Sequence, residues 1–280
     1  MNTLELLNSG SFKLQKLRIE THRLDAEILL SKVLNKKREQ ILIKLNQDMK
    51  NKEILEFNKL IKRRIFKEPV AYIVGEKEFW SKKFKVNKNT LIPRPETELL
   101  VEYLIKIYKN KKISLMDVGT GSGCILISLL SELSNCSGIG VDISSDAIKI
   151  AKENAILHKV ENRAKFFNRS IMKMNNCKFD LLVSNPPYID RKNIKNLDDG
   201  IKKHEPLVAL DGGNDGLDVI KKVIYKAKEI LKINGRLALE IGNRQSKEVS
   251  KELKNNNFKI EQNIKDYNCN TRCFISTLLK

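Results

Sequence analysis

Apolar residues in the first quarter of the chain are spaced three and four positions apart, as they are on one face of a helix. The clearest repeats are Leu24, Ile28, Leu29 and Val33, followed by Ile54, Phe57, Leu60 and Ile61. Asn35 and the pair Asn46-Gln47 interrupt this spacing. The pattern therefore predicts a bundle of four or five short helices over residues 1–67.

The polar residues of this helical region do not suggest catalysis. His22 is interpreted as a surface or cap residue, and Asp25 and Glu27 as part of a solvated helix face. The sharper interpretation of the region is that it binds a partner.

Residues 68–92 follow a different pattern. Pro69 and Gly75 end the helical spacing. Two short apolar runs, Glu78-Phe79-Trp80 and Phe84-Lys85-Val86, predict a β-hairpin joined around residues 81–83. We interpret this stretch as a linker that carries a hairpin.

From residue 93 to residue 280 short apolar runs alternate with helical spacing. Prolines at 93 and 95 precede Glu96 and Glu98, a combination that favours a helix start, and this helix should continue to about Lys109. The runs that predict buried strands are residues 114–118, 137–141, 164–168, 178–182, 235–241, 258–264 and 272–278. Alternation of strand and helix is typical of an α/β fold with a mainly parallel sheet. We predict a seven-stranded, Rossmann-like domain over residues 93–280.

Composition narrows the class of protein. The chain has 280 residues, of which 41% are hydrophobic and 31% charged, as in a globular protein with a sizeable core. The sequence contains no run of 18 apolar residues, so no membrane helix is predicted, and residues 1–5 do not resemble a secretory signal. The five cysteines include no Cys-x-x-Cys pair, which favours reduced thiols and no zinc site. We expect a cytoplasmic monomer without a membrane partner.

The net charge of +19 suggests a nucleic-acid partner at first sight. The lysines, however, are spread along the whole chain, and Asn and Ile are also frequent. This is the pattern that an A/T-biased genome writes onto exposed surfaces. We therefore discount direct binding of nucleic acid.

A glycine-rich turn lies between the first predicted strand of the sheet and the helix that opens at Cys124. It reads Gly119-Thr120-Gly121-Ser122-Gly123 and follows Asp117. Glycines let the backbone pass close to a ligand, and a helix amino terminus offers free N–H groups. Asp142 ends the second predicted strand about 20 residues further on, where an acid binds the ribose in βαβ nucleotide sites.

This turn differs from the dinucleotide fingerprint, whose third glycine would come one residue after Gly123. Gly-x-Gly-x-Gly after an acidic strand residue favours S-adenosylmethionine, which has no pyrophosphate to hold. The third predicted strand is followed by Ser170 and Ile171, which should border the adenine of such a cofactor.

Asn185-Pro186-Pro187-Tyr188 follows the fourth predicted strand. Taken alone, the motif is compatible with a strand end and a Pro-Pro turn. Its chemistry suggests more, because the Asn185 amide oxygen and the Pro186 carbonyl are two acceptors suited to an NH₂ group with two protons to donate. Tyr188 offers a flat face for a planar group. The polar stretch 200–215 is compatible with a lid over the substrate or with a long surface loop.

Taken together, these motifs resemble the bacterial release-factor glutamine N5-methyltransferases over nearly the whole chain. The segments that carry the resemblance are residues 23–27, 68–72, 75–80, 92–98, 117–123, 185–188 and 205–206. The glycine turn is shared by many methyltransferases, and Asn-Pro-Pro-Tyr also by adenine-N6 DNA methyltransferases. The proline-rich segment 92–98, joined to a helical amino-terminal region, is more specific to this family.

The resemblance implies a class I methyltransferase fold and S-adenosylmethionine-dependent methylation of the Gly-Gly-Gln glutamine in class 1 peptide chain release factors, with S-adenosylhomocysteine as product. It implies that residues 119–123 line the cofactor and that Asp142 holds its ribose. Asn185 and Pro186 would grip the glutamine amide, while Pro187 and Tyr188 would shape its pocket. The helical region would help to dock the release factor. Ser170 and Ile171 depart from the acidic and bulky residues that this family often has there.

Two other functions stay open at this stage. An adenine-N6 methyltransferase acting on DNA or RNA would use the same Asn-Pro-Pro-Tyr chemistry, although no separate target-recognition domain is apparent. A non-enzymatic module that only binds the cofactor would need neither Asn185 nor Tyr188.

Overall fold

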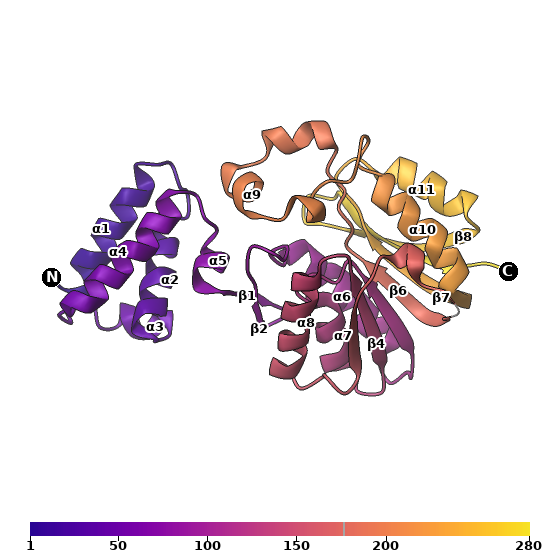
Figure 1. The fold of residues 1–280 in the computed structure, drawn as a ribbon, viewed down its shortest axis with the longest axis horizontal. Helices are drawn as coiled ribbons and strands as arrows, with labels where there is room; N and C mark the ends of the chain where they lie inside the picture. The colour runs from indigo at the N-terminus through magenta and orange to yellow at the C-terminus, as the bar shows by residue number, and fades with distance from the viewer. Residues whose placement is uncertain (176) are drawn as a thin grey trace. The chain divides into compact units, whose positions relative to one another are not determined.

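The computed structural model describes residues 1–175 and 177–280. Its internal contacts divide the chain into two compact units (Figure 1). One unit contains Met1–Glu76 together with Asp198–His204, and the other contains Lys77–Leu197 and Glu205–Lys280. No helix among these described residues is both long and apolar enough to cross a bilayer.

The amino-terminal unit is helical, as the spacing predicts. Its helices are α1 (Thr3–Gln15), α2 (His22–Leu34), α3 (Arg38–Leu42), α4 (Asn51–Ile65) and α5 (Val70–Val74). Leu7, Leu29 and Phe57 are fully buried in the core of this unit. Gly10 lets α1 approach α4 closely, since a Cβ at this position would lie 2.6 Å from the Phe57 ring.

The prediction that Asp25 and Glu27 form a solvated face is wrong. Both are only 5% exposed. Asp25 pairs with Arg64 on α4 at 2.7 Å, and the two carboxylate oxygens of Glu27 pair with Arg23 and Arg38, each at 2.7 Å. Buried carboxylates need such partners, so these two residues tie α2 to its neighbours.

The β-hairpin exists, but its predicted strand bounds are wrong. Strands β1 (Glu76–Phe79) and β2 (Lys82–Lys85) are joined by Trp80 and Ser81, whose φ angles are 53° and 52°. Trp80 is therefore a turn residue and not a strand residue. The Phe79 and Phe84 rings pack edge to face with centroids 6.1 Å apart, which sets the strand ends.

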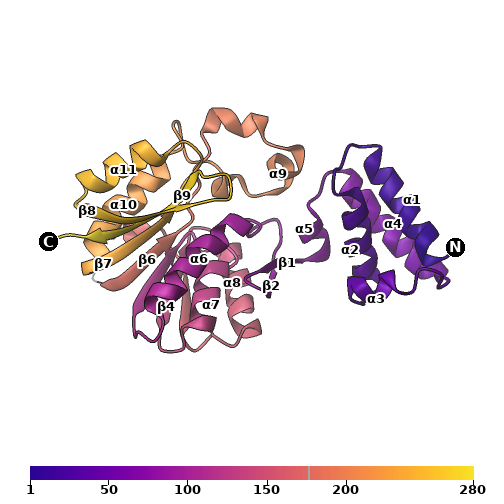
Figure 2. The ribbon, with the colours of Figure 1, turned by 180° about the vertical axis from the view of Figure 1, so that it is seen from behind.

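The larger unit is built on a seven-stranded sheet of order β5-β4-β3-β6-β7-β9-β8 (Figure 2). The strands are β3 (Ser114–Val118), β4 (Ser137–Asp142), β5 (Ala164–Asn168), β6 (Phe179–Ser184), β7 (Leu231–Glu240), β8 (Phe258–Lys265) and β9 (Thr271–Leu278). Only β9 runs antiparallel to its neighbours β7 and β8. This confirms the predicted mainly parallel class I methyltransferase sheet.

Helices cover both faces of this sheet. They are α6 (Pro95–Tyr108), α7 (Cys124–Glu132), α8 (Ser145–Leu157), α10 (Asp218–Ile230) and α11 (Ser246–Asn255). Alternate residues of each strand enter two separate cores: Leu115 and Val183 pack with α6, α7 and α8, whereas Met116 and Leu182 pack with α10 and α11. With both faces covered, ligands have access only at the sheet edges and strand ends.

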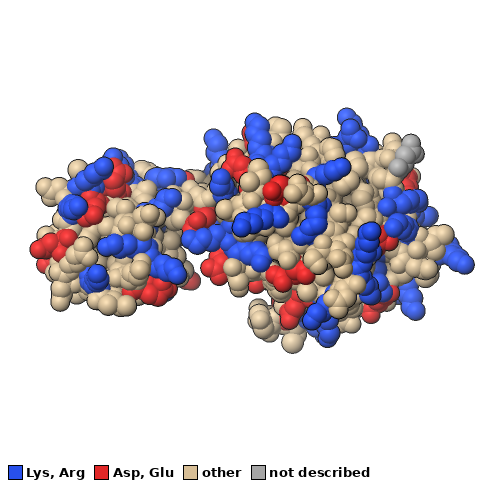
Figure 3. Space-filling model, turned by 90° about the horizontal axis from the view of Figure 1, so that it is seen from below, with Lys and Arg blue, Asp and Glu red and all other residues tan. Residues whose placement is uncertain are grey.

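Charged side chains are dispersed on the face drawn in Figure 3. Lysines and arginines lie over much of the surface, with acidic side chains among them. That dispersal on this face agrees with the compositional origin inferred for the net charge.

Candidate functional site

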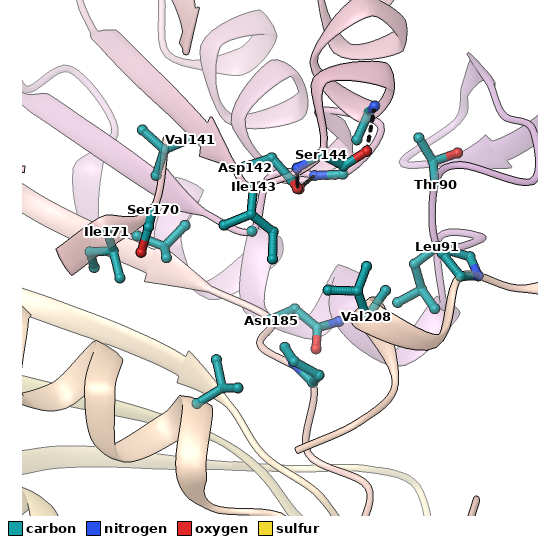
Figure 4. Close-up of a pocket in the computed structure, with 18 of the residues that line it drawn as sticks. Thr90, Leu91, Val141, Asp142, Ile143, Ser144, Ser170, Ile171, Asn185 and Val208 are labelled. Carbon is teal, nitrogen blue, oxygen red and sulfur yellow. Dashed lines mark hydrogen bonds between the residues drawn. The ribbon is translucent and has the colours of Figure 1, made fainter. Parts of the chain in front are cut away.

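A cavity of ≈ 640 Å³ opens at the carboxyl ends of β3, β4 and β6 (Figure 4). The chain crosses from β3 to β4 on one side and to β6 on the other, so this is the point where the strand order reverses. Open α/β sheets bind ligands at such a point. Val118, Asp142 and Asn185 line the cavity from the strand ends, and residues 89–91 and 206–209 line it from loops.

The glycine turn reaches this cavity through Gly119 and Gly121. Their φ angles are +71° and +54°, and a Cβ on Gly119 would meet nothing within 4 Å. Gly123 has a different role, because a Cβ there would lie 2.8 Å from Ile127 and 3.3 Å from Ala151. It allows α7 to pack against α8. Thr120, also predicted to bind the cofactor, is buried and does not line the cavity.

Asp117 lies beneath the turn and is completely buried. Its Oδ2 accepts a hydrogen bond of 2.6 Å from the Thr120 hydroxyl, whereas its Oδ1 has no partner among the described residues. Burial raises the pKa of Asp117 to about 7. Ser122 is likewise buried, and its hydroxyl oxygen has no hydrogen-bond partner in the part of the chain that the structure describes.

Asp142 lines the cavity and shapes the turn at the same time. Its Oδ2 accepts from the Gly121 N–H and its Oδ1 from the Ser144 N–H, both at 2.9 Å. Burial raises its pKa, and the backbone donors, Ser144 first, oppose this rise. Each carboxylate oxygen retains acceptor capacity for a further donor, such as a hydroxyl group.

Ser170 and Ile171 lie together on the cavity wall after β5. The Ser170 hydroxyl oxygen accepts a hydrogen bond of 3.3 Å from the Met172 N–H. Its own proton is therefore available to a ligand in the cavity. Ile171 is 8% exposed and supplies an apolar surface beside it.

The Asn185 side chain has one end fixed. Its Nδ2 donates to the Thr97 hydroxyl at 3.1 Å. No described residue donates to its Oδ1 or to the Pro186 carbonyl. Two acceptors next to each other in sequence are thus left at the end of β6, and Asn185 and Pro187 both line the cavity.

Tyr188 does not line this cavity but a second hollow of ≈ 480 Å³. The ring packs over Gly242, where a Cβ would lie 2.9 Å from Cδ2 of the tyrosine. Burial, and then the nearby Glu240, raise the pKa of Tyr188 to about 12. Residues of the segment 185–188 therefore border two different spaces, Asn185 and Pro187 the cavity and Tyr188 the second hollow.

Residues that no sequence motif indicates support the glycine turn. Asn154 on α8 is fully buried, and its Nδ2 donates to the Ser122 carbonyl at 2.9 Å and to the Lys85 carbonyl at 3.0 Å. It also accepts from the Lys85 N–H. The one signal in the sequence that could have revealed this role is an asparagine on the apolar face of a helix.

The wall made by residues 206–209 is anchored by an ion pair. Glu205 lies in the loop after α9 (Asp199–His204), with its side chain only 1% exposed, and it pairs with Arg94 at 2.6 Å. It also accepts from the Ile92 N–H at 3.3 Å. Through Glu205, Arg94 thus holds the two loop walls of the cavity together.

Replacing Glu205 should loosen both loop walls. Glu205→Gln leaves Arg94 without its counter-ion, so we expect about a tenfold higher Kd for a ligand of the cavity. Isothermal titration calorimetry with S-adenosylhomocysteine measures this directly. Asp199→Asn, which removes an exposed carboxylate in the preceding helix, is the matched control. An unchanged Kd for Glu205→Gln would mean that the ion pair does not hold the wall.

Comparison with known proteins decides the family. The PrmC N-terminal domain model matches residues 5–75, and a methyltransferase domain model matches residues 109–274. The release factor glutamine methyltransferase of Buchnera aphidicola subsp. Schizaphis graminum is 43% identical over 254 residues, which cover 90% of this chain and 91% of that protein. The chain belongs to the release factor glutamine methyltransferase family.

Some relatives of this chain are considerably longer than the chain. The bifunctional methyltransferase of Rickettsia typhi is 40% identical over 96% of this chain, but the match covers only 56% of that protein. The chain thus spans little more than half the length of the bifunctional relatives.

Among solved structures, the hMettl16 catalytic domain in complex with an RNA hairpin superposes with a TM-score of 0.59. The superposition covers 84% of each chain at 14% identity. At that identity the likeness concerns the fold alone, and it agrees with the class I methyltransferase architecture.

Proposed function

We propose that this chain transfers a methyl group from S-adenosylmethionine to the side-chain amide nitrogen of the Gly-Gly-Gln glutamine in class 1 peptide chain release factors. The observation that carries the proposal is that no described residue donates to the Asn185 Oδ1 or to the Pro186 carbonyl, while Asn185 lines the cavity together with Gly119, Gly121 and Asp142. Membership of the release factor glutamine methyltransferase family supports it.

The residues around the cavity fit the proposed cofactor. Gly119 and Gly121 leave room where any Cβ would project, and the buried Asp117 keeps an unpaired oxygen below them. Asp142 would accept hydrogen bonds from ribose hydroxyls, while Ser170 and Ile171 would border the adenine. When bound, S-adenosylmethionine supplies an electrophilic methyl group on a sulfonium sulfur.

The chain's own contribution is orientation. An amide nitrogen is a poor nucleophile because its lone pair is delocalised. Asn185 Oδ1 and the Pro186 carbonyl would accept hydrogen bonds from both N–H groups of the glutamine amide. These bonds would fix the orientation of the nitrogen and stabilise the positive charge that develops on it. One of these two N–H protons would be released to water once the nitrogen carries the methyl group, which leaves a neutral amide. Rate would come from positioning and electrostatics rather than from a strong base.

The second hollow gives Tyr188 a place in this scheme. It is lined by Tyr188 and by polar residues such as Asp190 and Asn193. We propose that the glutamine enters from this hollow, with Tyr188 and Pro187 shaping its path. Residues 1–67 are proposed to help dock the release factor, and the chain to act as a monomer.

A transfer assay tests the proposed function. The purified protein, incubated with methyl-labelled S-adenosylmethionine and a class 1 release factor, should label the factor. Replacing the Gly-Gly-Gln glutamine by alanine should reduce labelling to background, because no other amide would reach the acceptors. Peptide mass spectrometry locates the label. Labelling of DNA or RNA instead of the release factor would favour the adenine-N6 alternative and refute the assignment.

A further inference from the structure

A buried hydrogen-bond chain extends from Asn185 into the protein. Asn185 Nδ2 donates to Thr97 Oγ1 at 3.1 Å, and Thr97 Oγ1 donates to Glu240 Oε2 at 2.7 Å. Thr97 lies in the first turn of α6 and Glu240 ends β7. Both residues are only 2% exposed, and neither lines the cavity.

The direction of this chain follows from the number of protons on a hydroxyl group. Thr97 has a single hydroxyl proton, and an ionised Glu240 can only accept it. Thr97 Oγ1 can therefore only accept from Asn185, which forces the amide to present its NH₂ group to Thr97. The Asn185 oxygen is then the end left for a substrate.

We propose that Thr97 and Glu240 are positioning residues that fix the orientation of the Asn185 amide, so that its oxygen and not its nitrogen faces the substrate NH₂ group. The proposal rests on the proposed function for its substrate, but the orientation itself is a property of the free protein. Linked hydrogen bonds polarise one another, so the buried carboxylate also makes the Asn185 oxygen a stronger acceptor.

The charge on Glu240 is the variable part of the arrangement. Burial raises its pKa to about 7, while the hydrogen bond from Thr97, the charge of Arg272 on β9 and a hydrogen bond from the Asn185 side chain oppose the rise. Other titratable groups that act on Glu240, or on which it acts, are Glu96, Cys124, Tyr188 and Cys273. Glu240 therefore changes its charge close to neutral pH.

Protonation removes the constraint. A neutral Glu240 can donate its proton to Thr97 Oγ1, and the Thr97 hydroxyl is then free to donate to the Asn185 oxygen instead of accepting from its NH₂ group. A flipped Asn185 amide would present its NH₂ group to the NH₂ group of the substrate. Two donors would then face each other, and no hydrogen bond could form between them. We therefore expect kcat/KM for the release factor to fall as the pH drops through about 7.

Kinetics of three variants test the proposal. Thr97→Val keeps the shape but loses the hydroxyl, so kcat should fall about tenfold or more while the Kd for S-adenosylhomocysteine stays within about threefold. Thr97→Ser, which retains the hydroxyl, should recover most of the activity. Glu240→Gln should lower kcat and abolish the acidic limb of the kcat/KM profile. Glu161→Gln, an exposed carboxylate on the same unit, should leave the profile unchanged.

A second measurement does not depend on activity. The side-chain NH₂ signals of Asn185, assigned by their loss in Asn185→Ala, should shift and exchange faster with solvent in Thr97→Val but not in Thr97→Ser. Wild-type signals and kcat in Thr97→Val would overturn the proposal. So would an acidic limb that persists in Glu240→Gln, since Asp117, whose pKa is also about 7, would then be its source. A wild type that methylates no release factor would refute the proposed function, and the NH₂ signals would still decide the orientation.

Discussion

Asn185→Ala should slow methyl transfer severely and leave cofactor binding almost intact. The substitution removes the acceptor oxygen that faces the substrate amide, and its Nδ2 contact to Thr97 is lost with it. Loss of one preorganised group that acts on the reacting centre lowers kcat by about 10² to 10³-fold. Pro186 would remain, but a single carbonyl acceptor holds only one N–H bond and lets the amide rotate.

Two measurements separate the effects of Asn185→Ala. Single-turnover transfer to the release factor reports the chemical step, and calorimetry with S-adenosylhomocysteine reports the cofactor cavity. Asn263→Ala, on the exposed strand β8, is the matched control and should behave as wild type. If the Kd for the cofactor rose as much as kcat fell, Asn185 would serve mainly to shape the cavity, and the account of the acceptor pair would be wrong.

The sheet could be predicted because its signal is local. Leu115 and Met116 are adjacent in sequence and enter different cores, as the continuous apolar run of a strand covered on both faces requires. The strand ends then place Asp142 and Asn185 at one edge without any knowledge of the packing. This is why residues of the cavity could be found from motifs alone.

The hairpin shows where local patterns mislead. A two-residue turn with positive φ at both positions normally carries Asn or Gly, but here it is formed by Trp80 and Ser81. The turn signal is absent, and the bulky Trp80 looks like a strand residue. Packing of Phe79 and Phe84 decides the register instead, and sequence spacing does not contain that information.

Long-range contacts explain the other omissions. The carboxylate of Asp25 finds Arg64, 39 residues away, so its burial cannot be deduced from the residues around it. The same holds for the site: the contacts of Thr97 join residues 88 and 143 positions apart. Sequence motifs identify groups that would touch ligands, whereas the residues that orient those groups become visible only when the chain is folded.

Asp142→Ala should have the opposite effect to Asn185→Ala, weakening cofactor binding far more than it slows the chemical step. A carboxylate that accepts two ribose hydroxyls provides charge-assisted hydrogen bonds, and their loss raises the Kd by about 10² to 10³-fold. The Gly121 and Ser144 N–H groups also lose their acceptor, so the glycine turn becomes less well ordered.

The rate of methyl transfer by Asp142→Ala should therefore recover as the concentration of S-adenosylmethionine is raised. At saturating S-adenosylmethionine the kcat of Asp142→Ala should approach the wild-type value, because Asn185 and Pro186 are untouched. The kcat of Asn185→Ala should stay low at every cofactor concentration. Asp142→Asn is the matched variant: one side-chain oxygen remains to accept, and its Kd should lie between those of wild type and Asp142→Ala. If the Kd of Asp142→Ala for the cofactor equalled that of the wild type, the ribose would not bind at this end of β4. The proposed placement of the cofactor in the cavity would then be wrong.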